Sequence, residues 1–300
     1  MAHCGSRPGA AWQPETMAGL QARRALGALA AVAALVLVVA GCGGSGGGYG
    51  DSSASPSPQR TTPGALASQP PHLEAAPQPS GSPGFPAPTT EAGRRQLLTA
   101  VFDDAQDMWA KIFANSGMHY QQAKLTIFTG DVHTGCGEAS SDLGPFYCPA
   151  DHGVYLDTSF FTALQQRFGV QGGLPPAYVV GHEMGHHVQN LVGTLASVQA
   201  AQQAAPAQEN QLSVRLELQA DCYAGVWIHS SYARDLVSDA DLNDALHAAT
   251  VIADDFQQHK ATGTVRPDQW THGSAAQRRQ WLATGFTKGD PDSCDTFSAQ

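Results

Sequence analysis

The sequence is short of charge, and of positive charge above all. Charged residues make up 14% of the 300-residue chain, with 16 lysines and arginines against 26 aspartates and glutamates. An ordinary domain has about a quarter of its residues charged. No run of basic residues appears, so the chain lacks the clustered cations that hold phosphates, and we exclude nucleic acid as a partner. Six cysteines are too few for a fold built on disulfides alone.

No apolar run reaches the length of an ordinary membrane span. The longest covers residues 25–40, carries no charge and follows Arg23 and Arg24. A spanning helix needs about 20 apolar residues, so we interpret residues 1–41 as an export signal. The small residues before Cys42 resemble the lipobox of bacterial lipoproteins, which implies cleavage and lipidation at Cys42. An uncleaved anchor is the alternative, and both interpretations predict a chain attached to the cell membrane and facing outside the cytoplasm.

Residues 42–90 lack the apolar side chains that a core needs. Ten of the 19 prolines lie between residues 51 and 90, among many Gly, Ser and Ala residues. Such a composition cannot offset chain entropy by burial, so we predict a disordered linker. Residues 91–300 remain, which is enough for one domain with its own core.

The hydrophobic pattern of residues 91–300 predicts an α+β fold that is rich in helices. Alternation predicts a strand over residues 124–129 and a hairpin from residues 144–148 and 153–157. This small sheet precedes the central helix of the domain. Apolar residues at helical spacing predict helices over residues 94–113, 177–191, 208–231, 239–258 and 274–285.

The helix over residues 177–191 carries a metal-binding motif, H-E-x-x-H, at residues 182–186. Residues four apart share one face of a helix, so His182 and His186 can bind one Zn²⁺. Glu183 lies beside that face and can act as a general base on an activated water. A catalytic zinc needs a third protein ligand and one open position.

The third ligand is predicted to come from a later helix. A metzincin would have glycine and histidine three and six residues after His186, but Gln189 and Val192 stand there, so that class is excluded. Glu217 and Asp221 are four residues apart on the helix over residues 208–231. We expect Glu217 to bind the metal and Asp221 to accept a hydrogen bond from a ligand imidazole. Asp221 as the third ligand is the alternative.

At this point the sequence resembles a known family. Residues 148–157, 181–193, 217–227 and 271–278 resemble blocks of the bacterial family called "putative neutral zinc metallopeptidase". The resemblance runs from about residue 92 to residue 298. It implies a zincin-like, gluzincin-type peptidase domain that holds one zinc ion per chain.

The resemblance also suggests roles for residues 271–278, which look like the THPxxxxR motif of related gluzincins. It implies that His272 stabilises the oxyanion and that Arg278 orients Glu217 or the substrate. Two further interpretations stay open. Thr271 can cap a helix, which would leave His272 incidental, and Tyr223 can serve as the oxyanion donor in its place.

Two further features bear on the site. His187 points away from His182 and His186 on a helical wheel, so we interpret it as structural. Substrates of such enzymes usually pair with an exposed strand edge. Residues 154–157 and residues 124–129 are the two candidates for that edge.

Four cysteines lie in the predicted domain, and they allow three pairings. The pairs Cys136–Cys148 and Cys222–Cys294 are favoured, because the remaining pairings require both local segments to cross the domain. A metal-binding role for Cys222, beside Asp221, is the alternative. An oxidising compartment favours the disulfide.

The features together predict a zinc-dependent endopeptidase that hydrolyses peptide or protein substrates outside the cytoplasm. The main alternative is a non-catalytic, zinc-containing envelope lipoprotein that serves in binding or assembly. A zinc amidase acting on cell-wall peptide is a weaker one. Glu183 favours an enzyme, because a purely structural zinc site needs ligands but no base.

Overall fold

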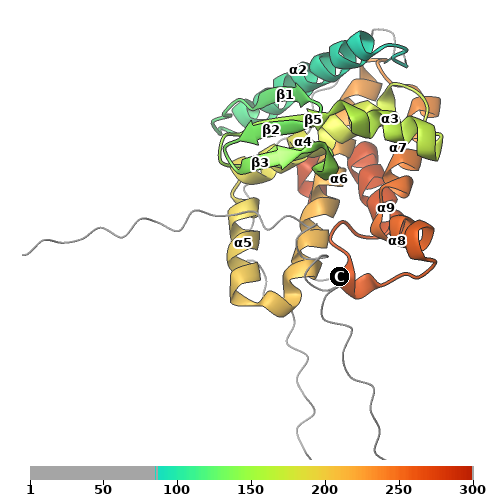
Figure 1. The fold of residues 1–300 in the computed structure, drawn as a ribbon. Coiled ribbons are helices and arrows are strands. Elements are labelled where there is room, and N and C mark those ends of the chain that lie inside the picture. Colours follow the sequence, from blue (N-terminus) through green and yellow to red (C-terminus); the bar gives the residue numbers. More distant parts are fainter. Residues whose placement is uncertain (1–84, 86, 299–300) are drawn as a thin grey trace, which may run out of the picture. The chain divides into compact units, whose positions relative to one another are not determined.

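The computed structural model describes residue 85 and residues 87–298 (Figure 1). The predicted signal segment 1–41, Cys42 and nearly all of the predicted linker lie outside the described residues. The extents of these segments therefore stay predictions. Within the described part of the chain, no helix is both long and apolar enough to cross a membrane.

A three-stranded sheet forms one side of the domain. Its order is β1 (Lys124–Phe128), β5 (Gly153–Asp157) and β4 (Phe146–Cys148), with β1 parallel and β4 antiparallel to β5. The predicted strand and hairpin are therefore confirmed. All five residues of β5 are buried, and residues 153–155 are paired on both sides, whereas Leu156 and Asp157 are paired with β1 alone. Strand β1 pairs with a described strand on one side only, so the choice between the two candidate edges stays a prediction.

Beside this sheet lies a smaller antiparallel pair, β2 (Asp131–Thr134) and β3 (Gly137–Ser140). The disulfide Cys136–Cys148 joins the turn between these strands to the end of β4. The first predicted pairing is thus confirmed. Helix α3 (Thr158–Phe168) follows β5 and begins where the carboxylate of Asp157 accepts two backbone N–H bonds.

Helix α4 (Leu174–Leu191) occupies the centre of the domain. It packs against α2 (Glu91–Asn115), against the long α6 (Glu209–Ala233) and against strands β4 and β5. Fourteen of its 18 residues are buried, which is far more than the single apolar stripe of a surface helix. The helix begins with two prolines in its first turn, and Gly193 follows it in the left-handed conformation with φ of 83°.

Two glycines bring α4 and α6 into close contact. A Cβ on Gly185 would lie 2.9 Å from the carbonyl oxygen of Ala220 and 3.0 Å from its Cα. A Cβ on Gly181 would lie 3.4 Å from the Cα of Ala224, which is ordinary packing, and 3.2 Å from the Trp227 ring. Of these two glycines, Gly185 therefore lies in the tighter contact with the α6 backbone.

The last long helix, α9 (Ala275–Lys288), packs along α6. Gly225 and Gly285 face each other at this contact, where a Cβ on Gly285 would overlap the carbonyl oxygen of Cys222. The short 3-10 helix η4 (Pro291–Cys294) follows, and the disulfide Cys222–Cys294 fastens it to α6. The second predicted pairing is confirmed as well.

One helix prediction was wrong. Residues 239–258 form two helices, α7 (Asp239–Val251) and α8 (Asp254–Thr262), separated by an extended Ala253. The break lets one carboxylate oxygen of Asp254 accept the backbone N–H groups of residues 271–273 at 2.6–2.9 Å. A continuous helix would not satisfy those three donors. Figure 1 also shows α5 (Thr194–Ala204), which was not predicted, lying beside the first half of α6.

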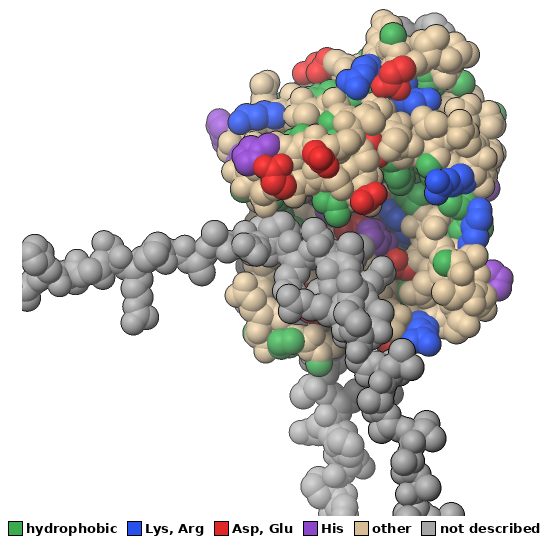
Figure 2. All heavy atoms as spheres, viewed as in Figure 1, with side chains coloured by type: hydrophobic (Ala, Val, Ile, Leu, Met, Phe, Trp, Pro, Cys, Tyr) green, Lys and Arg blue, Asp and Glu red, His purple; other side chains and the backbone are tan. Residues whose placement is uncertain are grey.

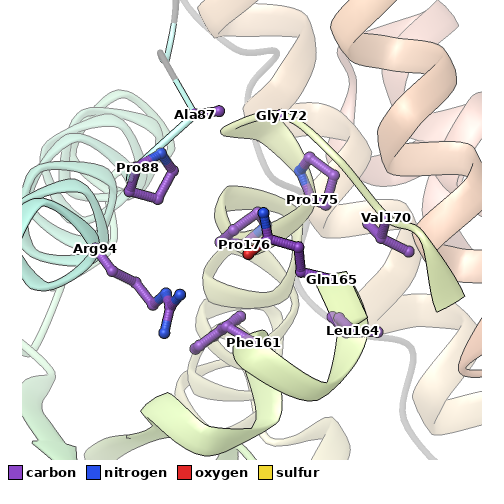
Figure 3. Close-up of a pocket in the computed structure, with 10 residues that line it drawn as sticks. All are labelled: Ala87, Pro88, Arg94, Phe161, Leu164, Gln165, Val170, Gly172, Pro175 and Pro176. Carbon is purple, nitrogen blue, oxygen red and sulfur yellow. The ribbon is translucent and has the colours of Figure 1, made fainter. Parts of the chain in front are cut away.

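A pocket lies where the starts of α2 and α4 meet α3 (Figure 3). Its lining is apolar apart from Arg94 and Gln165, and Pro175 and Pro176 form one wall. The Arg94 guanidinium donates to Thr162 at 2.8 Å and pairs with Glu91 at 3.2 Å. Because its charge is already partnered, this pocket offers no free charged group to a ligand.

We predict that Gly185→Ala destabilises the fold more than Gly181→Ala does. Alanine favours a helix over glycine by about 1 kcal/mol. At position 185 the new methyl meets the α6 backbone, and overpacking of this kind costs about 1–3 kcal/mol. Urea unfolding of both variants measures the difference. Equal stabilities would show that the contact tolerates a methyl group at either site.

Candidate metal centre

Two histidines of α4 and one glutamate of α6 meet in this fold. Nε2 of His182 lies 3.1 Å from one carboxylate oxygen of Glu217, and Nε2 of His186 lies 3.5 Å from the other. One ligand atom from each residue falls within 4.8 Å of the others, and no second such group was found among the described residues. The three side chains are 9–19% exposed, so an ion can reach them from solvent. In the face shown in Figure 2, histidine and acidic side chains line a hollow below β2 and β3.

The hydrogen bonds of the two histidines turn their Nε2 atoms toward Glu217. Nδ1 of His182 lies 2.9 Å from Asp221 Oδ1, and Nδ1 of His186 lies 2.8 Å from Gln189 Oε1. Both partners are acceptors, so each Nδ1 carries a proton. In the neutral imidazoles, both Nε2 lone pairs then face a carboxylate that also only accepts. A cation between them resolves this conflict.

The spacing of these atoms fits a tetrahedral ion. Zinc binds imidazole nitrogen and carboxylate oxygen at about 2.0–2.2 Å, which puts neighbouring ligand atoms about 3.3 Å apart. The two separations run to different oxygens of Glu217, 3.1 Å from His182 and 3.5 Å from His186, and each is close to that value. The residues therefore fit a divalent metal held by His182, His186 and Glu217.

The electrostatics favour a cation at the same point. Burial by itself lowers the pKa of His182, but the hydrogen bonds and charges of Asp221 and Glu217 outweigh it and raise that pKa to about 10. Burial raises the pKa of Glu217, yet the charges of His186 and His272 hold it well below its usual range. The site thus keeps a proton on an imidazole when no metal competes for it.

Asp221 lies behind His182 rather than among the ligand atoms. It accepts hydrogen bonds from His182, from the Tyr178 hydroxyl at 2.6 Å and from the Arg278 guanidinium at 2.8 and 2.9 Å. Burial opposes ionisation, but the charges and hydrogen bonds of Arg278 and His182 together outweigh it and lower the pKa of Asp221 to about 2. With both oxygens occupied, Asp221 has the position expected of an orienting carboxylate, and it is not placed to be the third ligand.

The predicted partner of Arg278 was wrong. The expectation was that Arg278 orients Glu217 or the substrate, but its nitrogens donate to Asp221 and to the Tyr178 hydroxyl. The residue is 2% exposed, so it cannot touch a substrate. Its place follows from the close packing of α9 on α6.

Glu183 follows His182 on α4 and is 6% exposed. Burial raises its pKa, while the charges of His182 and His186 lower it without cancelling the effect of burial. The net shift is upward. A carboxylate with a raised pKa in this position binds and releases a proton more readily at neutral pH than an exposed one does.

His272 lies in the loop before α9, close enough for its charge to lower the pKa of Glu217. Asp254 holds that loop through its three backbone bonds, and its second carboxylate oxygen lies 3.5 Å from Nδ1 of His272. Ser274 caps α9 in a capping box with Gln277. The interpretation in which Thr271 caps the helix was therefore wrong.

Neither Tyr223 nor Cys222 of α6 can take part in the chemistry of the centre. Tyr223 is 2% exposed and packs edge-on against Trp109 in the core, so its suggested role as an oxyanion donor was wrong. Cys222 is bonded to Cys294, so it has no thiolate to offer a metal, and its suggested role as a ligand was wrong as well.

His187 lies on α4 beside the metal-binding histidines but faces the opposite way. It is fully buried, and its two nitrogens meet the Gln121 carbonyl at 2.8 Å and the Tyr147 hydroxyl at 3.0 Å. Both nitrogens are therefore used within the fold. The structural interpretation of His187 agrees with this geometry.

Three residues at the site were not predicted as part of it. Tyr178 precedes His182 by four residues, and Gln189 follows His186 by three, so helical spacing puts each on the face of its histidine. That signal was available in the sequence. Asp254 had no local signal, because its partners lie 17 to 19 residues further along the chain.

Comparison with known proteins yields uncharacterised relatives. The chain is 46% identical over 203 residues to "Uncharacterized protein YpfJ" of Escherichia coli K12, which covers 67% of this chain and 71% of that protein. It is 49% identical over 193 residues to "Uncharacterized protein Rv2575" of Mycobacterium tuberculosis H37Rv, which covers 60% and 64%. No solved structure matches the chain significantly.

The match to a family model covers more of this chain than the alignment with either relative does. It covers residues 61–297 and comes from the family described as "Putative neutral zinc metallopeptidase". The resemblance seen in the four sequence blocks is thereby confirmed. Since this match takes in well over half of the chain and includes every residue of the metal centre, the protein belongs to that family of zinc metallopeptidases.

Proposed function

We propose that this protein is a zinc-dependent peptidase, and that it cleaves bonds within a peptide or protein chain. The observation that carries the proposal is the set of two imidazoles and one carboxylate, converging within 4.8 Å, with the buried Glu183 beside them. A zinc ion held there supplies Lewis-acid chemistry to an attacking water and to the peptide carbonyl.

Glu183 is the proton carrier in this proposal. As a carboxylate it accepts a proton from the attacking water, and as a carboxylic acid it donates that proton to the leaving nitrogen. A raised pKa suits the proton-carrying role, because it makes the carboxylate a stronger base than an exposed glutamate. His272 is the candidate hydrogen-bond donor to the oxyanion that forms at the carbonyl, held by Asp254.

We predict that Glu183→Gln in the full-length chain abolishes peptidase activity and keeps the metal. Loss of a general base costs about 100- to 10,000-fold in rate. None of the three ligand atoms is removed, so zinc content should remain at one ion per chain. Cleavage of casein and metal analysis measure the two quantities. A chelator should remove the activity of the unaltered protein.

The matched control is Glu209→Gln, which neutralises an exposed glutamate at the start of α6 and should leave the activity unchanged. If the unaltered protein binds zinc but neither it nor Glu183→Gln cleaves any peptide or cell-wall substrate, the enzyme proposal fails. A non-catalytic zinc protein would then be the better description.

We predict that zinc binding tightens as the pH rises from 6 toward 10. The pKa of His182 is about 10 in the metal-free protein, so the imidazole must lose a proton when the metal binds. Each released proton makes the affinity rise tenfold per pH unit below that pKa. Competition with a chromogenic chelator at several pH values measures this slope. A slope of zero would show that His182 binds no proton in the free site.

The raised pKa of His182 has the opposite effect on the stability of the metal-free protein, which should fall as the pH rises. A histidine whose pKa is higher in the folded state stabilises the fold below its unfolded pKa of about 6.5. That contribution disappears as the pH rises through about 10. The metal-free protein should therefore lose thermal stability from this source above about pH 6.5, and the zinc-loaded protein should not.

We further propose that the protein is exported and anchored in the cell membrane through a lipid on Cys42. Its two disulfides support this location, because disulfides persist in oxidising compartments. Metabolic labelling with a radioactive fatty acid should mark the full-length chain and should fail to mark Cys42→Ser. An unlabelled chain that still partitions into the detergent phase of a Triton X-114 extraction would favour an uncleaved anchor over a lipid.

A further inference from the structure

A chain of buried hydrogen bonds leads from His186 to the C-terminal disulfide. Gln189 Oε1 lies 2.8 Å from Nδ1 of His186, and its Nε2 donates to Gln219 Oε1 at 3.1 Å. Gln219 Nε2 donates in turn to the carbonyl oxygen of Cys294 at 3.0 Å. Cys294 is the residue bonded to Cys222.

The far end of this chain fixes the direction of every bond in it. A backbone carbonyl only accepts, so the Cys294 oxygen requires the nitrogen of the Gln219 amide. The Gln219 oxygen then faces Gln189 and requires its nitrogen, which also donates to the Leu216 carbonyl at 2.7 Å. The Gln189 oxygen is left for His186, whose Nδ1 must carry the proton. Nε2 of His186 is thereby left free to bind metal.

Water cannot substitute for these partners. Gln189 is fully buried, Gln219 is 1% exposed, and Cys222 and Cys294 are 0% and 1% exposed. In such surroundings an amide that loses its partner stays unsatisfied, which costs about 1–3 kcal/mol. This series of hydrogen bonds is therefore stable only in the arrangement in which every one of its groups is bonded.

The Cys222–Cys294 disulfide holds in place the carbonyl group at which this series of hydrogen bonds ends. It fastens η4 to α6 at a position next to Asp221, which orients the other metal-binding histidine. Beyond it, the Thr296 hydroxyl donates to the Arg215 carbonyl at 2.7 Å, and Arg215 donates to the Phe297 carbonyl at 3.3 Å. The segment from Cys294 to Phe297 thus lies along the stretch of α6 that carries Glu217.

We propose that Gln189 is a positioning residue for the metal ligand His186, and that it depends on the Cys222–Cys294 disulfide through Gln219. Removing any one of these hydrogen bonds frees His186 to rotate or to carry its proton on Nε2. The metal is then held less tightly. The inference rests on the metal site of the proposed function but not on peptide hydrolysis.

The test is the zinc affinity of the full-length chain, measured by competition with a chromogenic chelator. Gln189→Leu and Gln219→Leu keep the approximate volume and remove the hydrogen bonds. Altered orienting partners typically cost about 10- to 100-fold in metal affinity, and we expect a loss in that range for both. Gln189→Glu keeps an oxygen for His186 but loses the nitrogen that donates to Gln219 and to the Leu216 carbonyl, so it should lose affinity as well.

Asn190→Leu is the matched control on α4, because Asn190 bonds to Tyr147 rather than to His186. Its affinity should equal that of the unaltered protein. Nitrogen-15 NMR of the imidazoles adds a direct reading, since Gln189→Leu should lose the protected Nδ1 proton of His186. A fall in melting temperature without a change in affinity or in this signal would mean that Gln189 is merely structural.

The two disulfides form a second matched pair. Replacing Cys222 and Cys294 together by serine should weaken zinc binding about tenfold or more, whereas the same change at Cys136 and Cys148 should not. If the first double variant does not fold, Gln219→Leu still tests the coupling with both disulfides intact. Equal zinc affinities for Gln219→Leu and the unaltered protein would overturn the inference. A failure of the unaltered protein to bind zinc would instead overturn the proposed function.

Discussion

The close contact of α4 with α6 is the constraint on which the metal centre depends. The ligands come from two helices, so the imidazoles of one reach the carboxylate of the other only if the backbones nearly touch. Gly185 against Ala220 provides that approach, since a Cβ on Gly185 would meet the α6 backbone at about 3 Å. The contact lies one residue from His186 and one residue from Asp221, so a small change in helix spacing moves ligands and supporting residues together.

Charge balance explains why so many acidic groups are tolerated in the interior. Glu183, Glu217 and Asp221 are buried or nearly buried around the centre, and Arg278 is the buried guanidinium that pairs with Asp221. With all three carboxylates ionised, one guanidinium leaves two negative charges, which one divalent cation would balance. Uncompensated buried charge is costly, so a metal bound here and the acidic residues would stabilise each other.

Much of this centre follows from local spacing, and the rest from packing between distant segments. The four-residue spacings of His182 with His186 and of Glu217 with Asp221 predicted which side chains meet. The partner of Arg278 could not be predicted, because it is set by the contact of Gly225 with Gly285 between α6 and α9. The break between α7 and α8 likewise depends on backbone donors in the loop that begins at residue 271. Strands β2 and β3 and helix α5 lack clear apolar periodicity, so they gave little signal.

The closure of the centre by α9 has a consequence for the order of biosynthesis. Ligands from α4 and α6 leave the ribosome well before Arg278, which neutralises Asp221 behind His182. A nascent chain that ends before α9 therefore has the ligands but not the counter-charge that makes their burial favourable. The finished centre therefore requires α9, because a chain truncated before Arg278 would leave Asp221 without its buried counter-charge.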